Sequence, residues 1–300
     1  MPVGLSPFGI VYNSENGLVY IANFYSNSIS VLDGFTNDLI MTIPLDNNTF
    51  PAGVVTSPEN GLVYISNFYS PSATGANISE GIVTVINGST NSVVEAIQVG
   101  ISPLGIAFNP DNGNLYVTNF YSGSVSVING TTNSVVDTVS GISYPYQIAY
   151  NPANGNMYVT NPPTSSVAII DSSTNEVVGD IPVGLSPLGI AINPINGDLY
   201  ITNYNSDPSS TSYVSAIDDS TNSIITTIPT GGSGATGITF NPESGNMYVT
   251  NWYSQTVSVI STINLPQQQQ PLQPQQQQQQ QQPLQPQQQQ QQQQQPLQPQ

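Results

Sequence analysis

Residues 101–139 read ISPLGIAFNPDNGNLYVTNFYSGSVSVINGTTNSVVDTV, and this segment is the clearest indication of the fold class. It contains four short runs of β-prone residues, LGIAF, NLYVTN, SVSVI and SVVDTV, separated by Asn, Gly, Asp, Ser and Pro. Those separating residues favour tight turns, and NPDNGN and NGTTN are short enough to close hairpins. Because the periodicity of a long helix is absent, the stretch predicts four consecutive antiparallel strands.

The same unit recurs along the chain, marked by the string Tyr-x-x-Asn. Its six copies begin at Tyr20, Tyr64, Tyr116, Tyr158, Tyr200 and Tyr248. Repeats of this length with four strands each are typical of propeller blades. We therefore predict an all-β protein, a β-propeller of six four-stranded antiparallel blades over residues 1–264. The last blade is expected to lack its outermost strand, because its sequence ends at INLP after the third run.

Residues 265–300 have a different composition, with runs of Gln punctuated by QPLQP. This segment has too few apolar residues to offset the entropy cost of ordering its chain. A disordered tail with local polyproline II character is therefore expected. A flexible spacer is the first interpretation. A Pro-rich ligand for a partner domain and a self-associating Gln tract are the alternatives.

The repeat resembles the YVTN family of β-propeller repeats, which occurs in archaeal surface-layer proteins and related secreted propellers. The resemblance rests on YVTN followed by SVSVI and TNSVV, and it extends from Val3 to about Asn264. The family usually closes seven blades, whereas six copies are present here. The opening MPVGLSPFGI also matches IPVGLSPLGI at 181–190. We expect a chain cut from a longer propeller, in preference to a complete six-bladed ring with a three-stranded last blade. Taken alone, the chain is expected to form a six-bladed ring or a nearly closed arc.

The composition excludes several functions. The chain has no Lys, Arg, His or Cys and 17 carboxylates, which give a formal net charge of −17. Recognition of nucleic acid and polybasic attraction to anionic lipid both need Lys or Arg. Thiolate and imidazole metal sites and Cys or His catalysis are also excluded. No apolar run is long enough for direct membrane insertion. No basic, apolar signal precedes the first repeat, so an export signal would lie outside this chain.

The loops after Tyr-x-x-Asn are rich in aromatic residues, for example NFYSNS and NWYSQT. They are expected to share one mouth of the propeller with the Ser-Pro turns that enter the innermost strands. Phe24, Phe68 and Phe120 are interpreted as packing against neighbouring loops. The more exposed rings, whose polar groups suit a glycan or a protein partner, are the ligand-binding candidates. These candidates are Tyr25, Tyr69, Tyr121, Tyr204, Trp252 and Tyr253.

The positions of the carboxylates argue against catalysis. None lies on an innermost strand or in a Ser-Pro turn, so we expect no positioned acid–base pair at the mouth. No catalytic residue, metal site or cofactor is predicted. Weak Ca²⁺ binding by turns such as IDDSTN is compatible with their oxygen ligands, although turn formation accounts for those residues more simply.

The sequence therefore favours a non-enzymatic cell-surface or secreted propeller that serves as a structural, adhesive or ligand-binding module. The alternatives are a propeller enzyme of lactonase or lyase type and an intracellular protein-interaction scaffold. Glycosylation would be accessible in an exported protein at four Asn-x-Ser/Thr sites in predicted loops or turns. These sites are Asn47, Asn77, Asn87 and Asn129.

Overall fold

A computed structural model describes residues 2–47, 49–68 and 80–262 of the 300-residue chain. The described residues all belong to one compact unit, Met1–Leu265. The expected tail lies outside the described residues. Within the described ranges, no helix has the length and apolar character needed to cross a membrane.

The fold is all-β, as predicted: six sheets follow one another along the chain, each built from consecutive antiparallel strands. The strands of blades 1 and 2 are β1 (Pro7–Asn13), β2 (Leu18–Asn23), β3 (Ser28–Asp33), β4 (Leu39–Pro44), β5 (Pro51–Thr56), β6 (Leu62–Asn67), β7 (Gly81–Asn87) and β8 (Ser92–Val99). Those of blades 3 and 4 are β9 (Pro103–Asn109), β10 (Asn114–Asn119), β11 (Ser124–Asn129), β12 (Ser134–Ser140), β13 (Ile148–Tyr150), β14 (Asn156–Asn161), β15 (Ser166–Asp171) and β16 (Glu176–Pro182). Those of blades 5 and 6 are β17 (Pro187–Ile192), β18 (Leu199–Asn203), β19 (Tyr213–Asp218), β20 (Ser223–Pro229), β21 (Ala235–Asn241), β22 (Asn246–Asn251) and β23 (Thr256–Ser261). Blade 6 has three strands among the described residues, as its sequence predicts.

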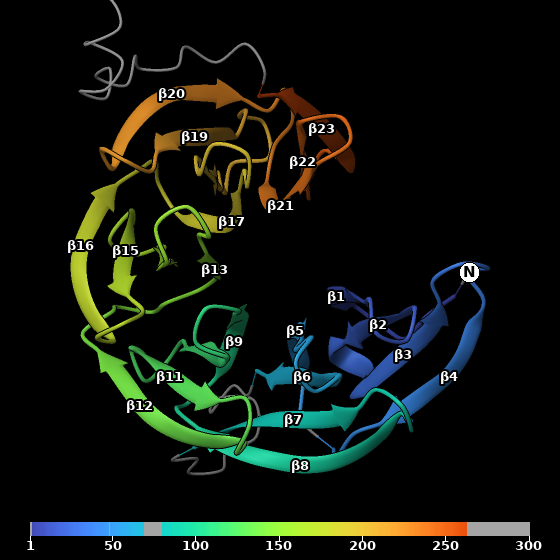
Figure 1. The fold of residues 1–300 in the computed structure, drawn as a ribbon. Helices are drawn as coiled ribbons and strands as arrows, with labels where there is room; N and C mark the ends of the chain where they lie inside the picture. The colour runs from blue at the N-terminus through green and yellow to red at the C-terminus, as the bar shows by residue number, and fades with distance from the viewer. Residues whose placement is uncertain (1, 48, 69–79, 263–300) are drawn as a thin grey trace, which may run out of the picture. The chain divides into compact units, whose positions relative to one another are not determined.

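The blades are arranged around a common centre, with the first strand of each blade innermost and the fourth outermost (Figure 1). Innermost strands of successive blades pack together, from β1 against β5 through to β17 against β21. Figure 1 shows an open side between blade 1 and blade 6, so the described residues form an arc rather than a closed ring.

The hydrophobic core lies between the blades, in five clusters that each join one blade to the next. Between blades 3 and 4, Tyr116, Val125 and Val127 pack with Met157 and Val159, and all five side chains are fully buried. Burying one such aliphatic side chain contributes about 1.5–3 kcal/mol. Because each cluster needs both of its blades, the stability of a blade depends on its neighbours.

In blades 1 to 3, the tyrosine of Tyr-x-x-Asn forms a hydrogen bond to the next blade. The Tyr116 hydroxyl donates to Asn175 Oδ1 of blade 4 at 2.9 Å and accepts from Asn112 Nδ2 of its own blade at 3.1 Å. Asn175 occupies the hairpin turn of the Thr-Asn segment with φ of 57°, a left-handed conformation that Asn tolerates well. The corresponding bonds in the preceding blades are Tyr20 to Asn91 at 2.6 Å and Tyr64 to Asn133 at 2.8 Å.

The third residue of the motif forms a second bond between blades. Thr118 Oγ1 donates to the Tyr146 carbonyl of blade 4 at 2.8 Å and accepts from the Gly105 N–H of its own innermost strand at 2.8 Å. The same donation recurs from Ser66 to Leu104, from Thr160 to Leu188 and from Thr202 to Thr236. In each of these joints the earlier blade supplies the hydroxyl donor and the later blade supplies the acceptor.

Candidate functional site

The two sets of loops that the sequence places at one mouth are joined by backbone hydrogen bonds. The Phe120 N–H donates to the Ser102 carbonyl at 3.0 Å, and the Tyr121 N–H donates to the Ile101 carbonyl at 3.2 Å. Ser122 Oγ completes the contact by accepting from the Ile101 N–H at 2.6 Å. The backbone bond from the first aromatic recurs from Phe24 to Ser6, from Phe68 to Phe50, from Tyr204 to Ser186 and from Trp252 to Gly234. We call this end of the propeller the axial mouth.

Backbone conformation at the axial mouth is unusual for the residue types present. The residue before each entering proline has a positive φ, between 47° and 56°. These residues are Ser6, Phe50, Ser102, Tyr144 and Ser186. Such a conformation is rare outside Gly, Asn and Asp, and it is least expected for aromatic residues such as Phe50 and Tyr144. In four of the five blades, the carbonyl of this residue accepts the hydrogen bond from the aromatic loop.

Aromatic rings around the axial mouth form a connected series through blades 1 to 4, which we call the aromatic chain. Its members are Phe8, Phe24, Tyr25, Phe50, Phe68, Phe120, Tyr121, Tyr144 and Tyr146. The Phe24 and Phe50 ring centroids lie 5.3 Å apart, and Phe120 and Tyr144 lie 5.2 Å apart in an edge-to-face contact. Phe68 joins the two halves, with its centroid 6.0 Å from Phe24 and 6.2 Å from Phe120. These distances are favourable for ring pairs.

The members of the aromatic chain differ in exposure. Phe24, Phe68 and Phe120 are half-buried and packed against neighbouring rings, as the sequence predicts. Tyr25 and Tyr121 keep 64% and 46% of their surface exposed. The phenylalanines therefore form a base, from which tyrosine rings reach solvent.

Two further aromatic groups come from blades 5 and 6. The Tyr204 hydroxyl donates to the Tyr253 hydroxyl at 2.7 Å. That hydrogen bond, with some burial, raises the pKa of Tyr204 to about 12, so the Tyr204 hydroxyl stays neutral at physiological pH. Trp252, beside Tyr253 in sequence, is 73% exposed.

The structure thus gathers part of the predicted binding set. Tyr25 and Tyr121 belong to the aromatic chain, Tyr204 and Tyr253 form a separate pair, and Tyr69 lies outside the described residues. Sequence reasoning missed Phe50, although its signal was available: Phe-Pro stands where other repeats have Ser-Pro.

Three carboxylates lie at the mouth, outside the innermost strands and the Ser-Pro turns. Asp46 lies in the loop between β4 and β5, and Glu80 and Asp207 lie in loops between the second and third strands of their blades, all at the end that carries the axial mouth. They come from three different loops. Asp207 accepts hydrogen bonds from Ser209 and Ser210, which lower its pKa. In the described ranges, no group of three or more Asp or Glu side chains is arranged to hold a metal ion.

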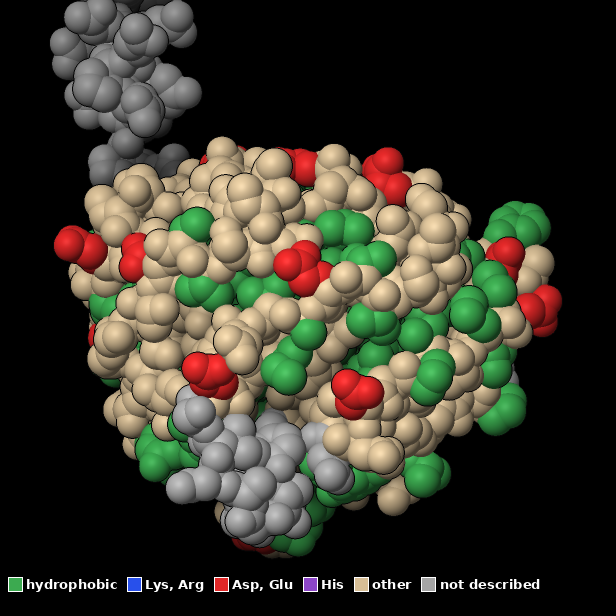
Figure 2. All heavy atoms as spheres, turned by 90° about the horizontal axis from the view of Figure 1, so that it is seen from below, with side chains coloured by type: hydrophobic (Ala, Val, Ile, Leu, Met, Phe, Trp, Pro, Cys, Tyr) green, Lys and Arg blue, Asp and Glu red, His purple; other side chains and the backbone are tan. Residues whose placement is uncertain are grey.

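Other carboxylates lie at the opposite end, in the turns between the first and second and between the third and fourth strands. Asp171 there accepts from the Ser173 hydroxyl and N–H, which lower its pKa, as expected of a turn-forming residue. Tyr150 donates to Asp111 Oδ2, and burial together with that bond raises the pKa of Tyr150 to about 12. On the rim, Figure 2 shows Asp and Glu side chains spaced apart, with apolar side chains between them.

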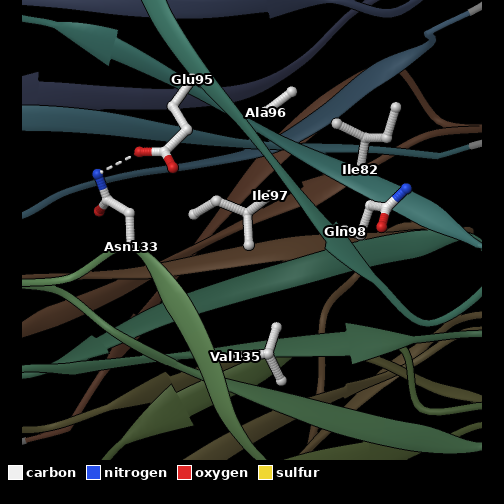
Figure 3. Close-up of a pocket in the computed structure, with 7 residues that line it drawn as sticks. All are labelled: Ile82, Glu95, Ala96, Ile97, Gln98, Asn133 and Val135. Atoms are coloured by element: carbon white, nitrogen blue, oxygen red, sulfur yellow. Dashed lines mark hydrogen bonds between the residues drawn. The ribbon is translucent and has the colours of Figure 1, made fainter.

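A groove on the rim, of about 430 Å³, lies where blades 2 and 3 meet. Figure 3 shows Asn133 of blade 3 donating to Glu95 of β8, a bond of 2.8 Å, with Ile97 and Val135 along the groove. The groove holds none of the predicted ligand-binding residues.

Three of the four predicted glycosylation sites are described. Asn47 is exposed in the loop after β4. Asn87 and Asn129 end β7 and β11, and their side-chain oxygens accept backbone N–H groups of the following turn. Asn77 lies outside the described residues.

Comparison with known proteins identifies the fold. The chain is similar to virginiamycin B lyase from Staphylococcus aureus, with 16% identity, a TM-score of 0.67 and coverage of 86% of this chain and 87% of that one. It is similar to a chain of Kuenenia stuttgartiensis hydrazine synthase, with 16% identity, a TM-score of 0.58 and coverage of 88% and 98%. It is also similar to a chain of the mitotic checkpoint complex, with 14% identity, a TM-score of 0.70 and coverage of 86% and 78%. No family model and no curated protein matches. At these identities the likeness establishes the β-propeller fold alone.

Proposed function

We propose that the protein is a non-enzymatic cell-surface or secreted binding module whose axial mouth contacts a glycan or protein ligand. The observation that carries this proposal is the aromatic chain, in which half-buried phenylalanines support exposed tyrosines at one end of the propeller. Supported rings lose little conformational entropy on binding. Their faces stack on sugar rings or apolar peptide groups, while their hydroxyls donate and accept hydrogen bonds.

The side chains near the mouth suit binding better than turnover. The chain has no His, and the mouth-side carboxylates Asp46, Glu80 and Asp207 come from three separate loops. General acid–base catalysis needs titratable groups positioned around one reacting atom. Virginiamycin B lyase shares the fold at 16% identity, which is too distant to bring its activity here.

An exported location is consistent with the composition. A chain with no Lys or Arg offers no cleavage site to trypsin-like proteases, and a net charge of −17 favours solubility. Glycosylation at the exposed Asn47 would support export.

The test uses the single Trp of the chain. Trp252 is exposed at the axial mouth, so its fluorescence reports ligand binding there. We would titrate the full chain with neutral oligosaccharides and with short peptides, and measure the affinities by calorimetry. The expected result is a saturable change in fluorescence with one of these two classes.

Variants then locate the site. Tyr25→Ala and Tyr121→Ala are expected to weaken binding about tenfold each, which corresponds to about 1.4 kcal/mol per stacking ring. The matched control is Phe35→Ala, because Phe35 is 94% exposed in the turn between β3 and β4, at the opposite end of blade 1. Equal effects of all three substitutions, or no binding in either ligand class, would contradict the proposal.

A further inference from the structure

We propose that Tyr204 and Tyr253 form an oxidative cross-linking site, at which the two rings couple into a dityrosine that joins blade 5 to blade 6 covalently. The two residues lie 49 positions apart in the sequence, in the loops that follow β18 and β22. The oxidant is hydrogen peroxide, used by a catalyst of the peroxidase type. The inference is independent of ligand binding at the axial mouth.

The two phenols meet at their hydroxyl ends. The Tyr204 hydroxyl donates to the Tyr253 hydroxyl at 2.7 Å, and the ring centroids lie 6.0 Å apart with 38° between the ring planes. Coupling joins the ring carbons next to each hydroxyl, so a hydrogen bond between the hydroxyls also brings those carbons close together. Tyr253 is 40% exposed and Tyr204 is partly exposed, so an oxidant has access to the pair.

The two rings are held by their own blades. The Tyr204 N–H donates to the Ser186 carbonyl at 3.0 Å, and the Tyr253 N–H donates to the Ser233 carbonyl at 3.2 Å. Gly234 packs closely beside the second ring, because a Cβ atom there would lie 2.8 Å from Tyr253 Cδ2. The rings therefore meet in a defined arrangement across the joint between two blades.

The same ring contact occurs at an earlier joint without the second hydroxyl. Phe68 holds the place of Tyr204 in blade 2, and Tyr121 holds the place of Tyr253 in blade 3. Their ring centroids lie 6.3 Å apart with 37° between the planes. Tyr204 therefore adds a hydroxyl to a repeated contact between blades, and tyrosine coupling requires that hydroxyl.

Tyr121 and Tyr144 provide a comparison pair at the axial mouth. Their centroids lie 6.3 Å apart, but the rings are edge to face at 80°, and no hydrogen bond joins their hydroxyls in the described ranges. They are 46% and 44% exposed. If exposure alone decided the reaction, this pair would couple at least as readily as Tyr204 and Tyr253. If the hydroxyl contact decides it, Tyr204 and Tyr253 couple first.

The reaction balances with one molecule of hydrogen peroxide. Each phenol loses one electron and one proton, and the two phenoxyl radicals form a bond between the ring carbons next to their oxygens. The hydrogens on those two carbons then move to the oxygens as the rings regain aromaticity. The peroxide takes up the two electrons and two protons and becomes two waters. Because the chain has no Cys and no Lys, disulfides and lysine isopeptide bonds cannot supply such a link.

The experiment treats the full chain with a peroxidase and hydrogen peroxide, at a protein concentration low enough to suppress coupling between molecules. A parallel reaction uses a light-activated ruthenium complex with persulfate, which is a small one-electron oxidant. Dityrosine fluorescence, excited at wavelengths that Trp252 does not absorb, follows both reactions. Cleavage before aspartates places Tyr204 in the short peptide 198–206 and Tyr253 in the C-terminal peptide, so mass spectrometry identifies the link as their summed mass less two hydrogens.

We expect the link between Tyr204 and Tyr253 to form about tenfold faster than a link between Tyr121 and Tyr144, because the reacting groups of the first pair are in contact. The linked chain should melt several degrees above the parent chain, since a covalent joint restricts the unfolded state.

Variants test the role of the hydroxyls. Tyr204→Phe and Tyr253→Phe each keep a ring in place, and each should abolish the link. Adding Phe68→Tyr to Tyr204→Phe should transfer the link to position 68 and Tyr121, where the ring contact already exists. Tyr144→Phe is the matched control and should leave the link between Tyr204 and Tyr253 unchanged.

Four results would overturn the proposal. The first is a parent chain that forms dityrosine between molecules but none within the molecule. The second is a link between Tyr121 and Tyr144 that forms as fast as the one between Tyr204 and Tyr253. The third is a Tyr204→Phe chain that gives the same linked peptides as the parent. The fourth is a double variant with Phe68→Tyr that forms no link to Tyr121.

Discussion

Replacing Tyr116 with Phe removes one hydroxyl from the joint between blades 3 and 4 and leaves the ring in place. The hydroxyl donates to Asn175 Oδ1 at 2.9 Å, lies 3.3 Å from the Ser172 carbonyl, and accepts from Asn112 Nδ2 at 3.1 Å. Removing one partner of a buried hydrogen bond costs about 1–3 kcal/mol. Asn112 keeps its bond to the Ser172 carbonyl, and Asn175 keeps its bond to Asp137. The expected loss therefore lies at about 1–2 kcal/mol.

Tyr200 provides a matched control at the same position of blade 5. It is also fully buried, but its hydroxyl has no hydrogen-bond partner among the described residues. Tyr200→Phe removes a polar group that is desolvated without compensation, so it should leave stability unchanged or raise it by up to about 1 kcal/mol.

Urea unfolding of the two variants and the parent chain measures the difference. The midpoints should separate in the order Tyr116→Phe, parent, Tyr200→Phe, with unchanged slopes. In thermal unfolding each kcal/mol corresponds to about 2–4 °C for a protein of this size. If Tyr200→Phe destabilises the protein as much as Tyr116→Phe, the inter-blade hydrogen bond is not the role of the motif tyrosine.

Three further results are expected. Val125→Ala should cost about 2 kcal/mol, because the side chain is fully buried, whereas Val257→Ala at the same repeat position should stay within about 0.5 kcal/mol in urea unfolding. Thr160→Val removes a hydroxyl that donates to the Leu188 carbonyl at 2.9 Å and should lower the free energy of unfolding by about 1–2 kcal/mol; a neutral effect would contradict the proposed joint. Burial, with the nearby Asp218 and Asp219, raises the pKa of Asp198 from 3.8 to about 6. The protonated form is therefore favoured in the folded state, and the resulting stability is fully present below pH 3.8 and lost as pH rises through about 6. Two pKa units correspond to about 3 kcal/mol, or about 1–2 kcal/mol after solvent screening, and Asp198→Asn should remove this pH dependence from unfolding curves measured between pH 4 and 7.

The sequence specifies the blades because each blade is a local structure. The strands of blades 2 and 3 are six to eight residues long, and the turns need residues such as Asn133 that adopt a left-handed conformation. Strand order within a blade follows from the short turns alone. The six repeats and the three-stranded last blade could therefore be predicted from spacing and turn chemistry.

The candidate site was predicted less completely, because it depends on contacts between blades. The aromatic loops could be assigned to one end of the propeller. The contact of Phe50 with Phe24 and the pairing of Tyr204 with Tyr253 depend on how neighbouring blades pack. Asp46 and Asp207 lie in longer loops whose approach to the mouth depends on how the loop folds, so their place does not follow from the strand pattern.

The bonds that join the blades have a consequence for tolerance of concentrated salt. The tyrosine, threonine and asparagine side chains that form them are neutral, so dissolved ions do not screen them. The 17 carboxylates, by contrast, repel one another in a chain without Lys or Arg, and screening relieves that repulsion. The free energy of unfolding of the propeller should therefore be at least as large in concentrated salt as in dilute buffer.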